Sequence, residues 1–144
     1  MPNASHRHDR TRLRAHADCR LCGRAQAEVP QLDFWPEADG SIRADFRCGP
    51  SSTGFDGMMH GGIAAAICDA AMCNVLFAAG IVAMTAKLEI RYRRPLRLHT
   101  DASVRAWLEQ CRGGGWWLKA TILQHDSVIV EASALFMMST ETAE

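Results

Sequence analysis

One apolar run, from Met58 to Gly80, limits most strongly what this chain can fold into. It reads MMHGGIAAAICDAAMCNVLFAAG, and Asp69 and Asn74 are exceptions among side chains that are almost all apolar. The pattern predicts a helix over about 61–79, ended by a glycine, which often terminates helices. The run is nearly long enough to cross a bilayer. Its polar residues, and the amphipathic strands that follow it, favour a buried core helix instead.

Segments of alternating polarity flank this run on both sides. Before it, residues 31–36 and 41–48 surround an Asp-Gly pair, which together predict a hairpin. After it, residues 85–95 alternate as a half-buried strand that ends at a proline. Three more strands are expected over 102–111, 116–125 and 127–138. One helix under a curved antiparallel sheet of five to six strands is an α+β layout.

Composition bounds the class of protein. At 144 residues the chain fits one domain, expected over 19–140, after a flexible leader over 1–18. Sixteen basic and sixteen acidic residues cancel, so no overall charge attracts nucleic acid or an anionic membrane, and neither is expected as a partner. The first residues contain no apolar segment of a secretory signal, and the six cysteines have the pattern of free thiols. We expect a reduced, cytoplasmic protein.

A helix that is apolar on all sides cannot be covered by one sheet alone. Its remaining face predicts a partner, most simply the same helix of a second copy related by a two-fold axis. The expected assembly is a homodimer or a dimer of such dimers.

Asp69 is the chemically unusual residue of the helix. On a helical wheel it shares a stripe with small apolar residues, and an ionised carboxylate buried without a partner is costly. It is therefore paired, has a raised pKa, or faces a cavity. Such carboxylates are candidates for a general base or a nucleophile. The alternative is a structural acid that is hydrogen-bonded to a loop backbone.

His60, Gly61 and Gly62 stand at the expected start of the helix. Free N–H groups there, together with the helix dipole, form an oxyanion site of the kind that acyl transfer requires. Eight residues separate Gly61 from Asp69, which places their backbones about 12 Å apart on one helix. One carbonyl cannot touch both. If they serve one reaction, the N–H donors and the carboxylate come from different subunits.

These residues resemble the hotdog-fold acyl-CoA thioesterases of the phenylacetate-pathway (PaaI) type. The resemblance covers about residues 19–138. Two segments show it most clearly: residues 54–72, GFDGMMHGGIAAAICDAAM, and residues 84–101, MTAKLEIRYRRPLRLHTD. In addition, CRLCG at residues 19–23 is similar to the start of some members. The resemblance implies a long central helix wrapped by a curved antiparallel sheet, in dimers or tetramers. It also implies hydrolysis of acyl-CoA thioesters, without a cofactor and without a metal in the reaction.

The resemblance also implies roles for individual residues. Asp69 acts as nucleophile or as general base on water, the N–H of Gly61 or Gly62 polarises the thioester carbonyl, and His60 shapes the turn. Thr85 helps to hold the water or the acid. Coenzyme A phosphates would suit a set of arginines, because Arg offers forked donors to phosphate oxygens; these are Arg91, Arg93, Arg94 and Arg97.

The loop before the helix departs from the family pattern. Many members have Asn or Gln there to assist the oxyanion side, whereas this chain has Ser52, Thr53 and Gly54. The hydroxyl of Thr53 and the carboxylate of Asp56 are the candidates to replace that contact.

Two other functions fit parts of the pattern. A non-catalytic acyl-CoA-binding module on the same fold would need no reactive acid. A hydratase would need a histidine that reaches the same carbon as the acid, and His60 precedes Asp69 in a thioesterase-like setting instead.

A zinc site is a separate possibility. Cys19 and Cys22 have metal-ligand spacing and lie near Cys48, His16 and His8 in the sequence, but the second Cys pair of typical zinc motifs is absent.

Overall fold

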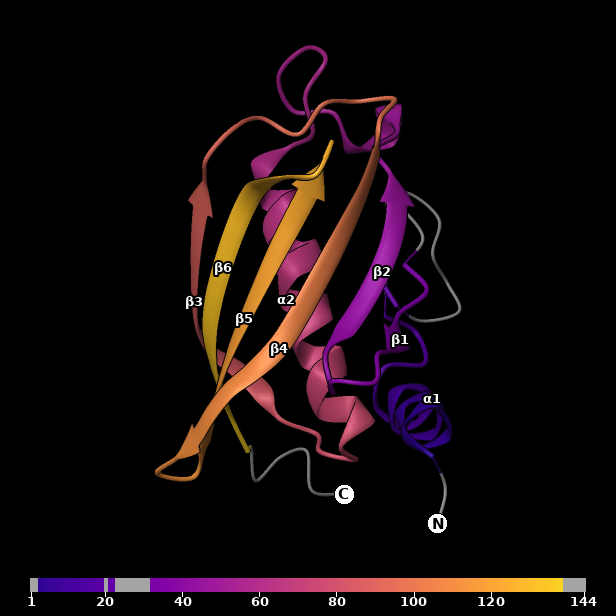
Figure 1. Ribbon diagram of the computed structural model, residues 1–144, viewed down its shortest axis with the longest axis vertical. Coiled ribbons are helices and arrows are strands. Elements are labelled where there is room, and N and C mark those ends of the chain that lie inside the picture. Colours follow the sequence, from indigo (N-terminus) through magenta and orange to yellow (C-terminus); the bar gives the residue numbers. More distant parts are fainter. Residues whose placement is uncertain (1–2, 20, 23–31, 139–144) are drawn as a thin grey trace.

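Six strands form one antiparallel sheet in the computed structural model, which describes residues 3–19, 21–22 and 32–138 (Figure 1). The strand order across the sheet is β1-β2-β4-β5-β6-β3, so the third strand of the chain lies at one edge. The strands are β1 (Trp35–Pro36), β2 (Ile42–Arg47), β3 (Met84–Tyr92), β4 (Asp101–Arg112), β5 (Gly115–Gln124) and β6 (Ser127–Met137). A short 3-10 helix, η1 (Pro50–Ser52), follows β2.

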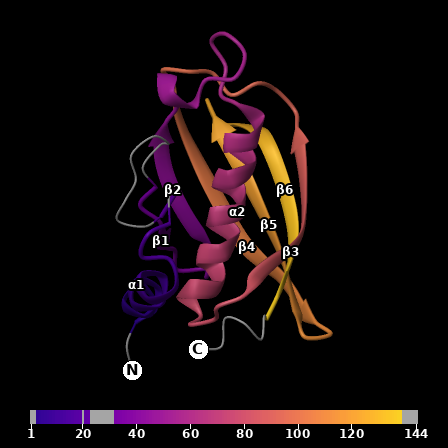
Figure 2. The same cartoon turned by 180° about the vertical axis from the view of Figure 1, so that it is seen from behind.

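The long helix α2 (Gly61–Ala78) lies against one face of this sheet (Figure 2). Its Ile67 and Met72 are fully buried in the same core as Val104 and Ile122 of the sheet. The helix ends where expected: Gly80 has φ +77°, and the N–H of Ile81 bonds to the carbonyl of Leu76 at 2.9 Å. Glycine adopts this left-handed conformation without a Cβ penalty. The α+β hotdog architecture is thus confirmed.

One helix among the described residues, α2, is long and apolar enough to cross a membrane. Most of it is buried within this fold, with a sheet on one side. Core helices of folded domains have the same composition, so length and hydropathy do not identify a membrane segment here.

The edge strand β3 differs from the expected half-buried strand, because nearly all of it is exposed in the single chain. Alternate side chains do face the helix side of the sheet: Leu88 and Tyr92 pair in register with the buried Ala134 and Val130. However, α2 does not extend over this edge, so Leu88 is 36% and Tyr92 51% exposed. This edge of the sheet therefore exposes the Leu88 and Tyr92 side chains beside α2.

The described part of the segment expected as a flexible leader over 1–18 contains a helix. Residues 4–15 form the helix α1 (Ala4–Ala15), capped by the Asn3 side chain, which accepts from the N–H of His6. The helix packs against the C-terminal end of α2, where Arg7 Nε donates to the Ala78 carbonyl at 2.6 Å. The segment buries polar rather than apolar side chains, so hydrophobic periodicity could not reveal it.

The helix α1 provides the hydrogen-bond partner of Asn74, the second polar residue of the apolar run. His8 is 1% exposed, and its Nε2 lies 2.7 Å from Asn74 Oδ1. The Asn74 amide donates to the Ala70 carbonyl, so both ends of the side chain have partners. A buried amide needs this, because an unpaired one is costly.

The predicted hairpin over 31–48 is present in a shorter form. β1 and β2 pair antiparallel, but β1 contains only Trp35 and Pro36. Proline has no N–H to donate, which confines it to an edge and ends the ladder early. Residue 31 lies outside the described residues. The other strands agree with prediction to within a few residues, and their hairpin turns carry positive φ at Gly113, Gly114, His125 and Asp126.

Candidate active site

His60 caps the N-terminus of α2. Its Nδ1 accepts the N–H of Gly62 at 2.9 Å, and its carbonyl accepts from Ile63 and Ala64. An imidazole that accepts at Nδ1 has its single proton on Nε2. The Gly62 donor is therefore used within the helix. Among the described residues the N–H of Gly61 has no partner, so the expected pair of oxyanion donors narrows to Gly61.

Tyr92 holds Gly61 from the other side, a contact that sequence reasoning missed. The phenol donates to the Gly61 carbonyl at 2.6 Å, and a Cβ on Gly61 would meet the Tyr92 ring at 3.4 Å. Burial, followed by the Cys68 thiol, raises the pKa of Tyr92, so its hydroxyl keeps its proton and remains a donor. The only sequence signal was its position on the inward face of the alternating strand.

Asp69 is held by Thr85. The Thr85 hydroxyl donates to Asp69 Oδ1 at 2.6 Å, joining the middle of α2 to the start of β3. We expected Asp69 to be buried, but it is partly exposed in the single chain, because the β3 edge beside it is uncovered. Its second oxygen has no partner among the described residues, so it is available to a water or a substrate. Thr85 lies at a bulge in the ladder between β3 and β6.

Asp69 and Gly61 are not brought together within one chain. They lie eight residues apart on a continuous helix, which corresponds to about 12 Å. β3 runs antiparallel to α2 and contacts both, through Thr85 near Asp69 and Tyr92 near Gly61. The chain therefore presents two separate half-sites along one uncovered edge.

A cavity of about 790 Å³ opens beside the Gly61 half-site. Its wall is formed by the end of β3 with the residues after it, the loop before α2 and the first turn of α2. Its apolar lining includes the side chains of Phe55, Met58, Met59 and Leu96. A largely apolar wall with an N–H donor at one end suits a ligand that has an apolar part and a polar carbonyl.

The loop before the helix is held by His60. The carbonyl of Ser52 accepts the His60 N–H at 2.7 Å, and a Cβ on Gly54 would lie 2.7 Å from the His60 Cα. Thr53 Oγ1 donates to the Pro50 carbonyl at 2.6 Å, so its proton is used locally. Asp56 is exposed and does not line the cavity. Neither candidate replaces the missing amide as a donor to the site in this chain.

The four predicted arginines divide between the two faces of the sheet. Arg93 and Arg94 line the cavity near Gly61. Arg93 is paired with Glu131 at 3.0 Å, whereas Arg94 has no ion pair among the described residues. Arg97 is exposed in the segment after β3, where its backbone N–H bonds to the Gln124 side chain.

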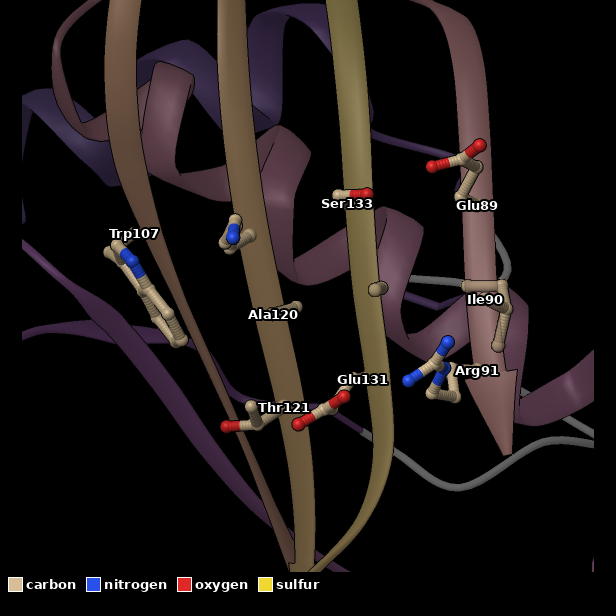
Figure 3. Close-up of a pocket in the computed structure, with 10 residues that line it drawn as sticks. Glu89, Ile90, Arg91, Trp107, Ala120, Thr121, Glu131 and Ser133 are labelled. Carbon is tan, nitrogen blue, oxygen red and sulfur yellow. The ribbon is translucent and has the colours of Figure 1, made fainter. Parts of the chain in front are cut away.

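Arg91 lies on the outer face of the sheet. Figure 3 shows it there with Glu131, Thr121 and Trp107, projecting from four strands away from α2. This depression of about 780 Å³ shares no lining residue with the Gly61 cavity. Arg91 therefore cannot act at the Gly61 site of its own chain, because the sheet lies between them.

Three potential metal ligands are brought together away from this site. One ligand atom each of His16, Cys19 and Cys22 lies within 4.8 Å of the other two. His8 faces Asn74 instead, and Cys48 lies beside the Gln124 amide, so neither joins the group. The hydrogen bond from Cys22, followed by that from His16, lowers the pKa of Cys19 to about 3.

The comparisons with known proteins agree with this geometry. Residues 56–113 match a family model described as Thioesterase superfamily. The chain is 35% identical over 106 residues to a Rattus norvegicus protein named acyl-coenzyme A thioesterase THEM4, which covers 72% of this chain and 46% of that protein. The chain thus spans about half the length of this curated relative.

Solved structures share the fold. RHA08564, a thioesterase superfamily protein, superposes with a TM-score of 0.77 and 27% identity, covering 81% of this chain and 61% of that one. A mutant of the phenylacetic acid degradation protein PaaI from Thermus thermophilus has a TM-score of 0.67 and 16% identity, covering 78% and 96%. The segment matched by the family model contains the start of α2, Asp69 and all of β3, so the chain is similar to the hotdog-fold thioesterases in the region that carries the candidate site.

Proposed function

We propose that this protein hydrolyses acyl-CoA thioesters to a free acid and coenzyme A. The observation that carries the proposal is the Asp69 carboxylate, held by Thr85 at 2.6 Å with its second oxygen open, in the middle of an apolar helix. A structural acid would have its oxygens used by the fold. The relative named acyl-coenzyme A thioesterase supports the choice of reaction and of substrate class.

Two routes use the same residues. As a general base, Asp69 takes a proton from water while the water oxygen attacks the thioester carbon. The C–S bond then breaks, and the coenzyme A thiolate leaves and takes up a proton. As a nucleophile, Asp69 itself attacks the thioester carbon, the C–S bond breaks and the coenzyme A thiolate leaves and takes up a proton. Water then hydrolyses the mixed anhydride, which releases the free acid and regenerates the carboxylate. In both routes the N–H of Gly61 at the helix N-terminus donates to the developing oxyanion.

The complete site requires two subunits. Gly61 and Asp69 are too far apart on one helix to act on one carbonyl, about 12 Å. A two-fold axis that packs the uncovered edges together would place Asp69 of one subunit opposite Gly61 of the other. Exposed apolar side chains on β3, including Leu88 at 36%, support this edge as the interface. A dimer is the smallest active unit, and a dimer of dimers would repeat it.

Arg94 is the proposed contact for the coenzyme A phosphates on the Gly61 side. It lines the cavity that would hold the thioester and has no ion pair to break among the described residues, whereas the Arg93 guanidinium is paired with Glu131 on the outer face of the sheet. Replacing Arg94 by Gln should raise KM with little change in kcat, because a phosphate contact far from the carbonyl binds the ground state and the transition state alike.

The decisive experiment measures free thiol release from a panel of acyl-CoAs. Asp69→Asn and Asp69→Ala should lower kcat about 100- to 10,000-fold, the range typical of a lost catalytic acid or base. Asp56→Asn is the matched control, because Asp56 is an exposed acid of the preceding loop that does not line the cavity. Hydrolysis at wild-type rate in both Asp69 variants would refute the mechanism.

The rival with the same fold is a non-catalytic acyl-CoA-binding module. It predicts saturable binding of an acyl-CoA, measured by calorimetry, with no thiol release from any member of the panel. A hydratase is less compatible with the geometry, because His60 Nδ1 accepts the N–H of Gly62 and is not free to take a proton from a substrate.

A further inference from the structure

We propose that His16, Cys19 and Cys22 form a zinc site. Their ligand atoms all lie within 4.8 Å of one another, and His16 Nδ1 is 3.6 Å from Cys22 Sγ. A tetrahedral zinc with bonds of about 2.0–2.3 Å holds neighbouring nitrogen and sulfur ligands roughly 3.5 Å apart. The imidazole and the thiol are therefore already at the spacing that one zinc ion imposes.

The ligand types select zinc among the common metals. Two thiolates and one imidazole are a soft donor set, whereas magnesium and calcium require oxygen ligands. The charge also balances, because two thiolates neutralise a divalent cation. This matters for Cys22, which is 2% exposed and could not carry an unpaired negative charge at low cost.

The chain holds the three residues in place through contacts outside the group. His16 is the C-cap residue of α1, and its ring packs edge-on against Phe77 with centroids 4.9 Å apart. The Arg12 guanidinium donates to the Cys22 carbonyl. Such outer contacts fix ligand orientation in metal sites.

The turn that carries Cys19 is shaped around its sulfur. The Cys19 N–H bonds to the His16 carbonyl at 3.1 Å, and the N–H of Leu21 points at Cys19 Sγ at 3.4 Å. An N–H aimed at sulfur stabilises a thiolate, which is the form that binds metal. His16 and Cys19 are only partly buried, so a water can reach the group and complete a tetrahedral coordination.

The consequence of the site is structural. The ligands follow α1 directly, and zinc would fasten the end of this helix to the side of α2, beyond the contacts made by Arg7 and His8. Metal binding therefore adds to folding stability, because the unfolded chain does not preform the site.

The alternative use of the pair is a Cys19–Cys22 disulfide, formed by loss of two protons and two electrons to an external oxidant. Both sulfurs are free thiols in this structure. A disulfide would leave the His16 nitrogen beside them without a partner, which is why the metal is favoured over the redox bond.

The test uses the full chain, purified under reducing conditions and titrated with zinc against a chelating dye. We expect one zinc per chain, and cobalt substitution should give thiolate-to-metal charge-transfer absorption. The Cys19→Ser/Cys22→Ser double variant and His16→Gln should lose binding at least tenfold. Cys111→Ser, which removes an exposed thiol from β4, should bind like the wild type. Cys19→Ser, at a partly exposed position, serves as well if the double variant fails to fold.

Two results would overturn the proposal. One is the absence of stoichiometric zinc in the reduced protein, with intact mass showing a disulfide in the oxidised one. The other is zinc that persists in the folded Cys19 and Cys22 variants, which would place the metal elsewhere. With binding present, a chelator should lower the melting temperature of the wild type and leave that of the Cys19→Ser variant unchanged.

Discussion

The Thr85 hydroxyl donates to Asp69 Oδ1 at 2.6 Å, across the gap between the edge strand and the central helix. This bond fixes the carboxylate that we propose as the general base or nucleophile, and its donor lies on the uncovered edge strand β3. Thr85 is therefore a positioning residue, which acts on the reaction through Asp69.

Thr85→Val tests this bond. A hydrogen bond to a charged group contributes about 1.5–3 kcal/mol, so we expect kcat to fall about 10- to 100-fold with little change in KM. Thr85→Ser keeps the hydroxyl and should retain most of the activity, measured by thiol release. Equal losses in the Val and Ser variants would show that packing, rather than the hydroxyl, is what matters at this position.

Tyr92→Phe tests the hydrogen bond that fixes Gly61, the proposed oxyanion donor. The phenol bonds to the Gly61 carbonyl at 2.6 Å, and a neutral hydrogen bond contributes about 0.5–1.5 kcal/mol. We expect kcat to fall roughly 2- to 10-fold because the Gly61 backbone is less well fixed. The ring remains in Phe, so steady-state kinetics should show KM nearly unchanged. A rise in KM at constant kcat would assign Tyr92 to substrate binding instead.

Gly54→Ala should destabilise the loop that holds His60. The new Cβ would lie 2.7 Å from the His60 Cα, a backbone atom that cannot move aside cheaply. We expect a loss of about 1–3 kcal/mol in urea unfolding, with reduced activity. Gly49→Ala is the matched control: its φ is −101°, nothing lies within 4 Å, and its effect should stay within about 0.5 kcal/mol. Equal stability of the two variants would contradict the contact.

His8 should make the fold sensitive to mild acid. Its burial lowers its pKa below the ordinary value of 6.5, although Asn74 and Asp9 act in the opposite direction and Arg12 adds to the lowering. The unfolded chain then binds a proton at a higher pH than the folded chain does. The stabilisation is complete above 6.5 and is lost as the pH falls from 6.5 toward the folded-state pKa.

Urea unfolding at about pH 7.5 and pH 5.5, on either side of the ordinary histidine pKa, measures this loss. His8→Gln can still donate to Asn74 but cannot titrate, so its stability should fall less between the two values. An identical fall in both proteins would assign the acid sensitivity to other groups.

Much of the fold could be predicted from residue pattern. The apolar run fixed a helix that ends at Gly80, and the alternating segments fixed the strands, because both patterns follow from the geometry of one element and one buried face. The N-terminal helix could not be predicted in this way. Its buried groups are His8 and Thr11, and polar side chains are buried only when distant partners such as Asn74 accept their hydrogen bonds.

The candidate site, like the fold, could be predicted from the sequence only in part. The sequence alone pointed to most of the residues that we propose for the reaction, since a single acid in an apolar helix and a His-Gly-Gly segment at the helix start can be recognised without a structure. Only the tertiary structure decided that Gly61 rather than Gly62 keeps a free donor, that Tyr92 fixes it, and that Arg91 lies on the opposite face of the sheet. The reason is physical: a donor's availability depends on which atoms lie within about 3 Å of it, and distant parts of the chain supply those atoms only after folding.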